Sequence, residues 1–319
     1  MNKFVSVLVI LLVIVSCQNE LEKKVDVSGI EVEVSIDRFD QKFYKTTIET
    51  LPKIKSDYPF LFPEQNPDSV WLNRINNEDE IELFKKAQAV FENFESEELQ
   101  IEALFKHIKY YHPTFNSPQI LTLISNIDFQ NKVLYSENFL FISLDMYLGG
   151  NDEAYNNFPM YLARNFDKSQ LGVDMANAIG GFYFSPPNSR QFVDLLINEG
   201  KKMYQLDCYL PTASDAQKMG YSVENIEWAI SNEVPVWKFF IENKLLYSTD
   251  SNLYTRFISD APFSKFFIDI DKESPGKIGV WLGWQIVRSY MRNNDVTLQQ
   301  LLETNSEEIF KNSKYKPKK

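Results

Sequence analysis

One helical stretch, residues 192–204 (FVDLLINEGKKMY), restricts the fold more than any other part of the chain. Its apolar residues recur at helical spacing and form one stripe, which the core should cover. These residues are Phe192, Leu195, Leu196, Met203 and, just beyond, Leu206. Glu199 falls in the middle of the stripe, and a core-facing carboxylate is costly unless it is hydrogen-bonded, paired or bound to a metal. Glu199 is therefore either a structural lock or part of a site.

The composition favours a mostly helical protein with a large core. Of the 319 residues, 44% are hydrophobic, and only 11 are glycine. The abundance of Leu, Ile, Phe and Glu also favours helices. The formal net charge of −11 makes nucleic acid an unexpected partner. We predict an α+β protein, predominantly α-helical, in which a small β-sheet packs with a helical C-terminal half.

The N-terminus has the features of a secretory signal followed by a lipidation site. Residues 1–16 (MNKFVSVLVILLVIVS) combine Lys3 with an apolar run that is too short to span a bilayer comfortably. Cys17 follows Ile14-Val15-Ser16, which resembles the lipobox of bacterial lipoproteins: an aliphatic residue at −3, a small residue at −1, then cysteine. We expect signal peptidase to remove residues 1–16 and Cys17 to carry the lipid.

Lipidation of Cys17 would hold the chain at a membrane. Several buried acyl chains, at ~0.8 kcal/mol per CH₂, give a stable anchor. Loss of Lys3 leaves 32 basic and 44 acidic residues, a charge of −12. Gln18 is not the aspartate that would favour inner-membrane retention, so we expect the outer membrane, on the side that faces the periplasm. Residues 17–29 then form a lipidated N-terminus and tether, and residues 30–319 a single globular domain.

Four apolar segments predict the small sheet, namely residues 30–36, 120–127, 133–135 and 139–144. The first segment, IEVEVSI, alternates apolar and polar residues, which is typical of a half-buried strand. The other three are bounded by Asn, Asp and Ser.

Two helices are predicted ahead of the main β-rich region, over residues 78–94 and 96–111, with Ser96 as an N-cap. We expect them to form an antiparallel pair. His107 and His112 lie at the end of the second helix, five positions apart, whereas i,i+4 spacing places two ligands on one face. We therefore predict that both histidines are surface or cap residues.

A long helix is predicted near the C-terminus, over residues 275–294. Gly279 and Gly283 are four positions apart, so another helix backbone can approach closely there. Arg288 argues against a membrane span. Cys208 has only Cys17 as a possible partner, so we expect no intrachain disulfide and a buried, unreactive side chain.

Few residues qualify for chemistry, because no nucleotide-binding glycine motif and no CxxC pair occur. The helix over residues 169–184 carries Asp174 and Asn177 beside its apolar face, upstream of Glu199-Gly200. The arrangement resembles the zincin metallopeptidases of the Glu-ligand type. In these enzymes one helix carries His-Glu-x-x-His, and a second helix, roughly twenty residues later, supplies a glutamate ligand.

The match to the zincin pattern is incomplete. Glu199-Gly200 fits the second helix, but residues 173–177 place Val and Asn where the imidazoles should be. One carboxylate and one carboxamide hold zinc poorly. We therefore expect no metal, no cofactor and no catalysis, and we regard Asp174, Asn177 and Glu199 as a candidate relict site in a zincin-like fold.

Longer motifs resemble the GldB family of gliding motility lipoproteins of the Bacteroidetes. They are the lipobox at Cys17, IEVEVSIDRFDQKFY, YPFLFP, NEGKKMYQLDCYLP, IEWAISNEVPVWKFFIENKLLYSTD, APFSKFF and SPGKIGVWLGWQIVRSYM, with the ending SKYKPKK. The resemblance covers essentially the whole mature chain. It implies a membrane-anchored envelope protein that gliding requires, associated with machinery that is tied to type IX secretion. Only Cys17 carries over as a functional position.

Three hypotheses about function remain. The first is a non-catalytic gliding component that acts through protein contacts and takes no small-molecule ligand. The second is a periplasmic metallohydrolase-like enzyme that uses Asp174 and Glu199. The third is a cell-wall-binding module with Trp237, Trp281 and Trp284 exposed as a platform. We adopt the first hypothesis.

Overall fold

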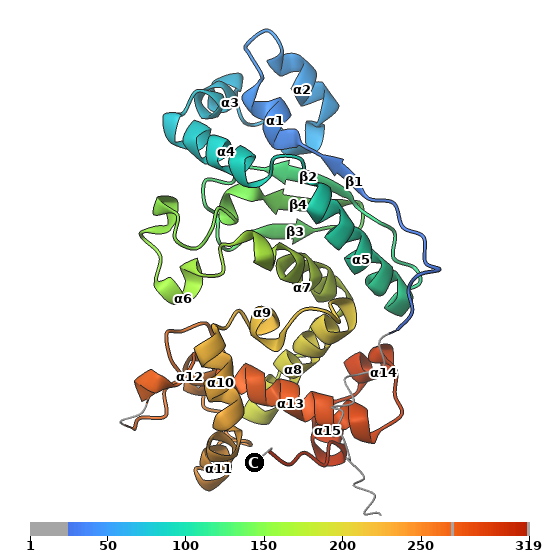
Figure 1. Ribbon diagram of the computed structural model, residues 1–319, viewed down its shortest axis with the longest axis vertical. Coiled ribbons are helices and arrows are strands. Elements are labelled where there is room, and N and C mark those ends of the chain that lie inside the picture. The colour runs from blue at the N-terminus through green and yellow to red at the C-terminus, as the bar shows by residue number, and fades with distance from the viewer. Residues whose placement is uncertain (1–24, 269–270, 318–319) are drawn as a thin grey trace, which may run out of the picture.

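A small mixed sheet with helices around it, followed by a helical C-terminal half, makes up the fold (Figure 1). The structure is a computed structural model that describes residues 25–268 and 271–317. The predicted α+β class and the helical majority are confirmed. Cys17 and the signal segment lie outside the described residues.

The sheet has the strand order β1-β2-β4-β3. Its strands are β1 (Ser35–Asp37), β2 (Gln119–Leu123), β3 (Val133–Tyr135) and β4 (Phe139–Ser143). Strands β1, β2 and β4 run parallel, and β3 pairs antiparallel with β4. Successive residues of β2 are buried, as expected for a parallel strand covered on both faces.

Two strand predictions differ in extent from the structure. Residues 30–34 alternate as predicted, with Val32 and Val34 packed against the core, but ladder pairing begins only at Ser35. The strand predicted over residues 120–127 ends at Leu123. The chain then turns because Asn126 and Ile127 both take a left-handed conformation, with φ of 60° and 61°.

An N-terminal helical cap sits beyond β1, at the top of Figure 1. It comprises α1 (Phe39–Tyr44), α2 (Leu51–Asp57), a 3-10 turn (Pro59–Leu61) and α3 (Asp68–Ile75). Aromatic residues dominate its own apolar cluster, which includes Phe39, Phe43, Phe62 and Trp71 and meets the sheet at Leu121.

The two helices before β2 are present but do not form the expected pair. α4 (Glu78–Val90) packs against α1, α3 and the turn after β4, whereas α5 (Glu95–Tyr111) packs against α7 and α8. They separate because Phe94, between them, is left-handed (φ 60°) and directs its side chain into the core. Phe94 is also the N-cap of α5, so the predicted cap at Ser96 is wrong.

Three long helices form the centre of the C-terminal half. They are α7 (Leu171–Tyr183), α8 (Phe192–Tyr209) and α13 (Ile278–Asn293). α7 contacts both β3 and α8, so it joins the sheet to the helical half, and α13 crosses α8 closely. The main apolar core is continuous from Leu83 in α4 to Ile309 in α15.

Shorter helices complete the fold; α6 (Met160–Ala163) lies at the side of the sheet, and the others lie around the helical half (Figure 1). These others are α9 (Asp215–Met219), α10 (Val223–Ser231), α11 (Glu233–Glu242), α12 (Asn252–Phe257), α14 (Leu298–Glu303) and α15 (Ser306–Asn312). Among the residues that the structure describes, no helix is both long and apolar enough to cross a bilayer.

Candidate functional site

Asp174, on α7, faces the sheet. Its Oδ2 accepts hydrogen bonds from Lys132 Nζ at 2.5 Å and from the Tyr147 hydroxyl at 2.9 Å. Burial beside this carboxylate raises the pKa of Tyr147 well above its usual value, so the hydroxyl keeps its proton for Asp174. Asp174 is thus committed to a fixed ion pair. Asn177, one turn further along α7, is exposed to solvent.

Glu199, on α8, is not the buried lock that we expected. A quarter of its side chain is exposed, and its carboxylate pairs at 2.7 Å with Lys202, one turn further along the same helix. The apolar stripe is present, with Phe192, Leu196 and Leu206 all buried. Glu199 lies at the edge of the buried face, where a flexible side chain reaches water. It holds no second helix through this ion pair.

In the Glu199-Gly200 pair of α8, it is the glycine that the packing of the helix requires. A Cβ atom on Gly200 would overlap the backbone carbonyl of Gly283, and a Cβ on Gly283 would overlap the carbonyl of Leu196. α8 and α13 therefore touch backbone to backbone at this crossing, which confirms the close approach predicted for Gly283. Gly279 is also packed closely, though less tightly, because its Cβ would lie 2.7 Å from the carbonyl oxygen of Phe257 in α12.

The buried carboxylate of α8 is Asp207, eight residues beyond Glu199. It accepts hydrogen bonds from Arg288 Nε and Nη2, each at 2.7 Å, from Trp284 Nε1 at 2.8 Å and from Lys218 Nζ at 2.8 Å. The outer side of Arg288 also binds Asp215. These carboxylates hold the pKa of Arg288 above its usual value, despite the opposing effect of burial. The structural lock predicted on α8 therefore exists, at another residue.

His112 ends α5 as a C-cap, as predicted, but it is buried and not at the surface. Its ring stacks on Tyr183 at 3.7 Å, and its Nε2 lies 2.6 Å from the Tyr209 hydroxyl. Burial lowers the pKa of His112 to about 4, so the ring is neutral at pH 7. His107 is partly exposed, and its Nδ1 lies 2.8 Å from the Ala103 carbonyl oxygen. The two histidines share no site.

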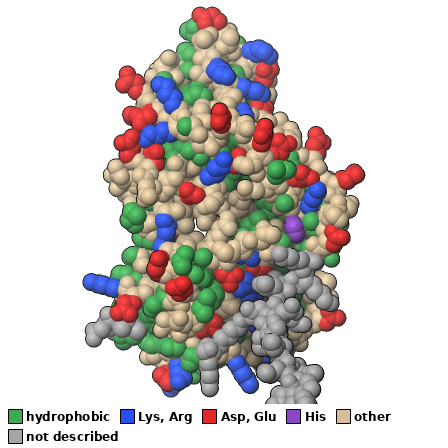
Figure 2. All heavy atoms as spheres, viewed as in Figure 1, with side chains coloured by type: hydrophobic (Ala, Val, Ile, Leu, Met, Phe, Trp, Pro, Cys, Tyr) green, Lys and Arg blue, Asp and Glu red, His purple; other side chains and the backbone are tan. Residues whose placement is uncertain are grey.

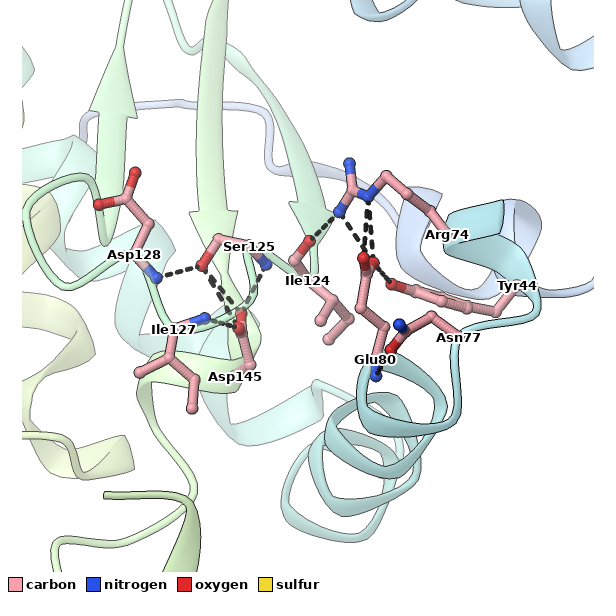
Figure 3. A network of polar contacts seen from close by, with 9 residues as sticks. All are labelled: Tyr44, Arg74, Asn77, Glu80, Ile124, Ser125, Ile127, Asp128 and Asp145. Carbon is pink, nitrogen blue, oxygen red and sulfur yellow. Dashed lines mark hydrogen bonds and ion pairs between the residues drawn. The ribbon is translucent and has the colours of Figure 1, made fainter. Parts of the chain in front are cut away.

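Sequence reasoning missed a polar network at the carboxyl ends of β2 and β4 (Figure 3). Asp145, fully buried after β4, accepts from the backbone N–H groups of Ser125 at 2.9 Å and Ile127 at 2.7 Å, and also from the Ser125 hydroxyl. Burial nevertheless raises the pKa of Asp145. The left-handed turn at Asn126-Ile127 wraps the chain around this carboxylate.

A second acid, Glu80, completes the network in Figure 3. It accepts from the Tyr44 hydroxyl at 2.7 Å and forms an ion pair with Arg74, whose Nη2 also donates to the Ile124 carbonyl. Burial and Glu80 together raise the pKa of Tyr44. Tyr44, Arg74 and Ile124 also line a cavity of about 100 Å³ in the helical cap, whose other walls are mainly aromatic. In both acids of this network, Asp145 and Glu80, each carboxylate oxygen accepts at least one hydrogen bond.

Metal ligation finds no support among the residues that the structure describes. Nowhere in this part of the chain do three or more His, Cys, Asp or Glu side chains gather in a way that could hold an ion. Asp174 and Glu199 each contact a lysine of their own. Cys208 is buried, as predicted.

Comparison with known protein families identifies the family of this chain. The model of the gliding motility protein GldB matches residues 20–317, which is almost the whole chain. The chain belongs to the GldB family. Membership implies the role of a gliding motility lipoprotein and confirms the resemblance noted in the sequence. No curated protein and no solved structure matches the chain.

Proposed function

We propose that the protein is a lipid-anchored, non-catalytic component of the gliding apparatus that acts through protein contacts. In this proposal Cys17 carries the lipid, residues 17–29 form the tether, and residues 30–319 form one globular domain on the periplasmic side of the outer membrane. The partners are other proteins of the gliding and type IX secretion machinery. The family match over residues 20–317 is the observation that carries the proposal.

The state of the candidate acids supports a non-catalytic role. Catalytic zinc needs about three good ligands gathered at one point, and a carboxylate paired with a lysine is stabilised in its ionised form. Lys132 and Tyr147 both donate to Oδ2 of Asp174, and Lys202 pairs with Oε1 of Glu199, so a lysine neutralises each carboxylate. Asn177 is exposed to solvent. Among the described residues no group of three or more His, Cys, Asp or Glu side chains could hold an ion, so the metallohydrolase hypothesis has no assembled site on which to build.

The tryptophans likewise offer no carbohydrate platform. Trp281 and Trp284 are buried in the core and pack against each other edge to face. Trp237 lies elsewhere, against Phe310 and Tyr315. The three rings therefore form no shared exposed face. The cell-wall-binding hypothesis requires such a face, so the structure does not support it.

The test of the proposal is the substitution Cys17→Ala in the native chain. Without the thiol no lipid can be attached, so we expect the protein to leave the membrane fraction and the cells to stop spreading on agar. Ser16→Ala is the matched control, because alanine keeps the small residue before the cysteine, and both membrane association and spreading should persist. A soluble, stable Cys17→Ala protein that supports normal spreading would contradict the proposal.

A further inference from the structure

Two segments that are far apart in the sequence form one surface of the helical half. Residues 233–247 contain α11, and residues 306–317 contain α15 and the C-terminal segment. The Trp237 ring lies 6.1 Å from the Phe310 ring and 5.3 Å from the Tyr315 ring, and Tyr247 lies 6.5 Å from Phe310. We call this surface the basic–aromatic face.

The C-terminal segment is fixed to the fold. The Ser313 carbonyl accepts from Ser289 Oγ at 2.8 Å and from Asn293 Nδ2 at 2.9 Å. Two residues later, the Tyr315 hydroxyl donates to Glu233 Oε1 at 2.8 Å. These bonds tie the segment to α13 and α11, so its side chains have defined directions.

Lysines point outward from this segment. Ser313 is buried and Tyr315 partly buried, whereas Lys314 and Lys316 between and beyond them are exposed. Other exposed lysines lie in the same two segments, namely Lys238, Lys244 and Lys311. The fold therefore presents a set of ammonium groups around the aromatic cluster, and Figure 2 shows basic side chains at this lower end of the molecule.

The charge of this face is opposite to that of the chain. Residues 233–247 and 306–317 together hold five lysines and four glutamates, a net charge of +1, whereas the whole chain has a formal charge of −11. Of these glutamates, Glu233 is buried against Tyr315, and Glu307 is paired with Lys311. Glu242 and Glu308 remain exposed. The net positive charge favours an anionic partner.

Apolar side chains on the same face indicate which kind of anionic partner it binds. Ile241 and Tyr247 are exposed, and Trp237 is partly exposed beside them. Trp and Tyr favour the boundary between lipid headgroups and acyl chains, and lysines near an anionic leaflet are attracted to it. The combination fits the surface of an anionic bilayer.

The position of the tether gives independent support. In Figure 1 the described chain begins near α14, in the same half of the molecule as α11 and α15, while the helical cap lies at the opposite end. Cys17 precedes Val25 by eight residues, and eight extended residues reach at most ~29 Å. A lipid on Cys17 would thus hold this half of the molecule near the membrane.

We propose that the basic–aromatic face rests on an anionic lipid surface, so that the helical cap (residues 39–75) points away from the membrane toward partners. This inference rests on the proposed lipid anchor at Cys17. It adds a fixed orientation, because an anchor alone would leave the domain free to turn on its tether.

The test uses the full lipidated protein in vesicles. Acylation rates of individual lysines are measured by mass spectrometry, first in vesicles of equal parts phosphatidylglycerol and phosphatidylethanolamine, then in phosphatidylcholine alone. We expect the exposed lysines of the face to react severalfold more slowly in the anionic vesicles, namely Lys238, Lys244, Lys311, Lys314 and Lys316. Lys45 and Lys53, exposed on the cap, should react equally in both. High salt should remove the difference, because it screens surface charge.

A triple variant, Lys238→Glu, Lys314→Glu and Lys316→Glu, provides the second arm. All three side chains are exposed, so the fold should persist, and protection of Lys244 and Lys311 should disappear. Lys45→Glu with Lys53→Glu is the matched control and should leave the protection intact. Flotation of the protein with the vesicles reports the lipid anchor separately.

The outcomes separate the two proposals. Protein that floats with anionic vesicles but shows equal lysine reactivity on both faces overturns the orientation and leaves the anchor standing. Protection that appears only in whole envelopes, and in neither kind of vesicle, also overturns it, because a protein partner would then cover the face. Protein that does not float contradicts the anchor and the orientation together.

Discussion

Arg288 on α13 and Asp207 on α8 form a bidentate ion pair, with Nε and Nη2 each 2.7 Å from a carboxylate oxygen. Lys218 and Trp284 bind the same carboxylate, so one side chain joins α8, α9 and α13. The pair is buried, with 2% of the Asp207 side chain exposed. A buried charge network of this kind holds elements in register as long as it is complete.

Asp207→Asn should destabilise the protein strongly. The amide cannot accept all four hydrogen bonds, and it leaves the buried ammonium of Lys218 without its counter-charge. Breaking one partner of a buried ion pair costs about 3–5 kcal/mol, so we expect a loss of that size in the free energy of unfolding. Equilibrium denaturation in urea measures it.

Glu199→Gln is the matched control for Asp207→Asn, on the same helix. Its ion pair with Lys202 is local and partly exposed, so the expected loss is at most about 1 kcal/mol. Cells that carry Glu199→Gln should spread like the wild type. Equal losses for the two variants would show that the lock does not lie at Asp207, and defective spreading with a stable Glu199→Gln protein would revive the enzyme hypothesis.

Gly283→Ala should disrupt the crossing of α8 and α13. The new Cβ would overlap the Leu196 carbonyl, and backbone atoms cannot move aside without separating the helices. Overpacking a tight core costs about 1–3 kcal/mol, and a rigid backbone contact lies at the upper end of that range. The change should appear as a lower midpoint of urea denaturation.

Gly181→Ala provides the comparison for Gly283→Ala. Gly181 also lies inside a helix, α7, but nothing lies within 4 Å of where its Cβ would be. Alanine has the better helix propensity, so this variant should gain up to about 1 kcal/mol. If both alanine variants changed stability in the same direction, the close crossing would not be the cause.

His112 should make stability depend on pH below neutrality. Its folded pKa of about 4 lies under the unfolded value of 6.5, so between these values the unfolded chain binds a proton that the folded chain does not. Stability is therefore complete above pH 6.5 and falls as the pH drops toward 4. The shift corresponds to a loss on the order of 3 kcal/mol, measurable by urea denaturation across this range.

His112→Gln tests this assignment. Glutamine is polar, can still bond to the Tyr209 hydroxyl and does not titrate, so the slope between pH 6.5 and 4.5 should flatten even if stability at pH 7 is lower. An unchanged slope would show that another group is responsible.

The sequence predicted the helices and the apolar faces well, because these depend on local periodicity. Phe192 and Leu196 fall on the buried side of α8 as their spacing requires, and Gly283 lies where two backbones meet. Periodicity gives a direction around a helix but not the depth of a side chain. It therefore selected Glu199, at the edge of the buried face, in place of Asp207.

Side-chain contacts between residues far apart in the sequence were not predicted. The contact of His112 with Tyr209 joins positions 97 residues apart, so nothing next to His112 in the sequence indicates burial. The turn at Asn126-Ile127 was missed for another reason. A β-branched residue with positive φ is strongly disfavoured, and only the fold, through Asp145, stabilises it.

Asp145→Asn should release that turn. The carboxylate accepts from two backbone N–H groups and a hydroxyl, and an amide would turn its own N–H₂ toward at least one donor. An unsatisfied buried donor costs about 1–3 kcal/mol, and the left-handed turn at Asn126-Ile127 loses its support as well. We expect lower stability in urea and faster hydrogen exchange at the Ser125 and Ile127 amides.

Asp128→Asn is the control for Asp145→Asn, in the same turn. The Asp128 carboxylate makes only local bonds, to the Gln130 amide and the Asn131 side chain, so its loss should cost well under 1 kcal/mol. Exchange at the Ser125 and Ile127 amides should stay slow in this variant. If both variants accelerated exchange equally, Asp145 would not be the residue that holds the turn, and the left-handed conformation of Ile127 would need another source of support.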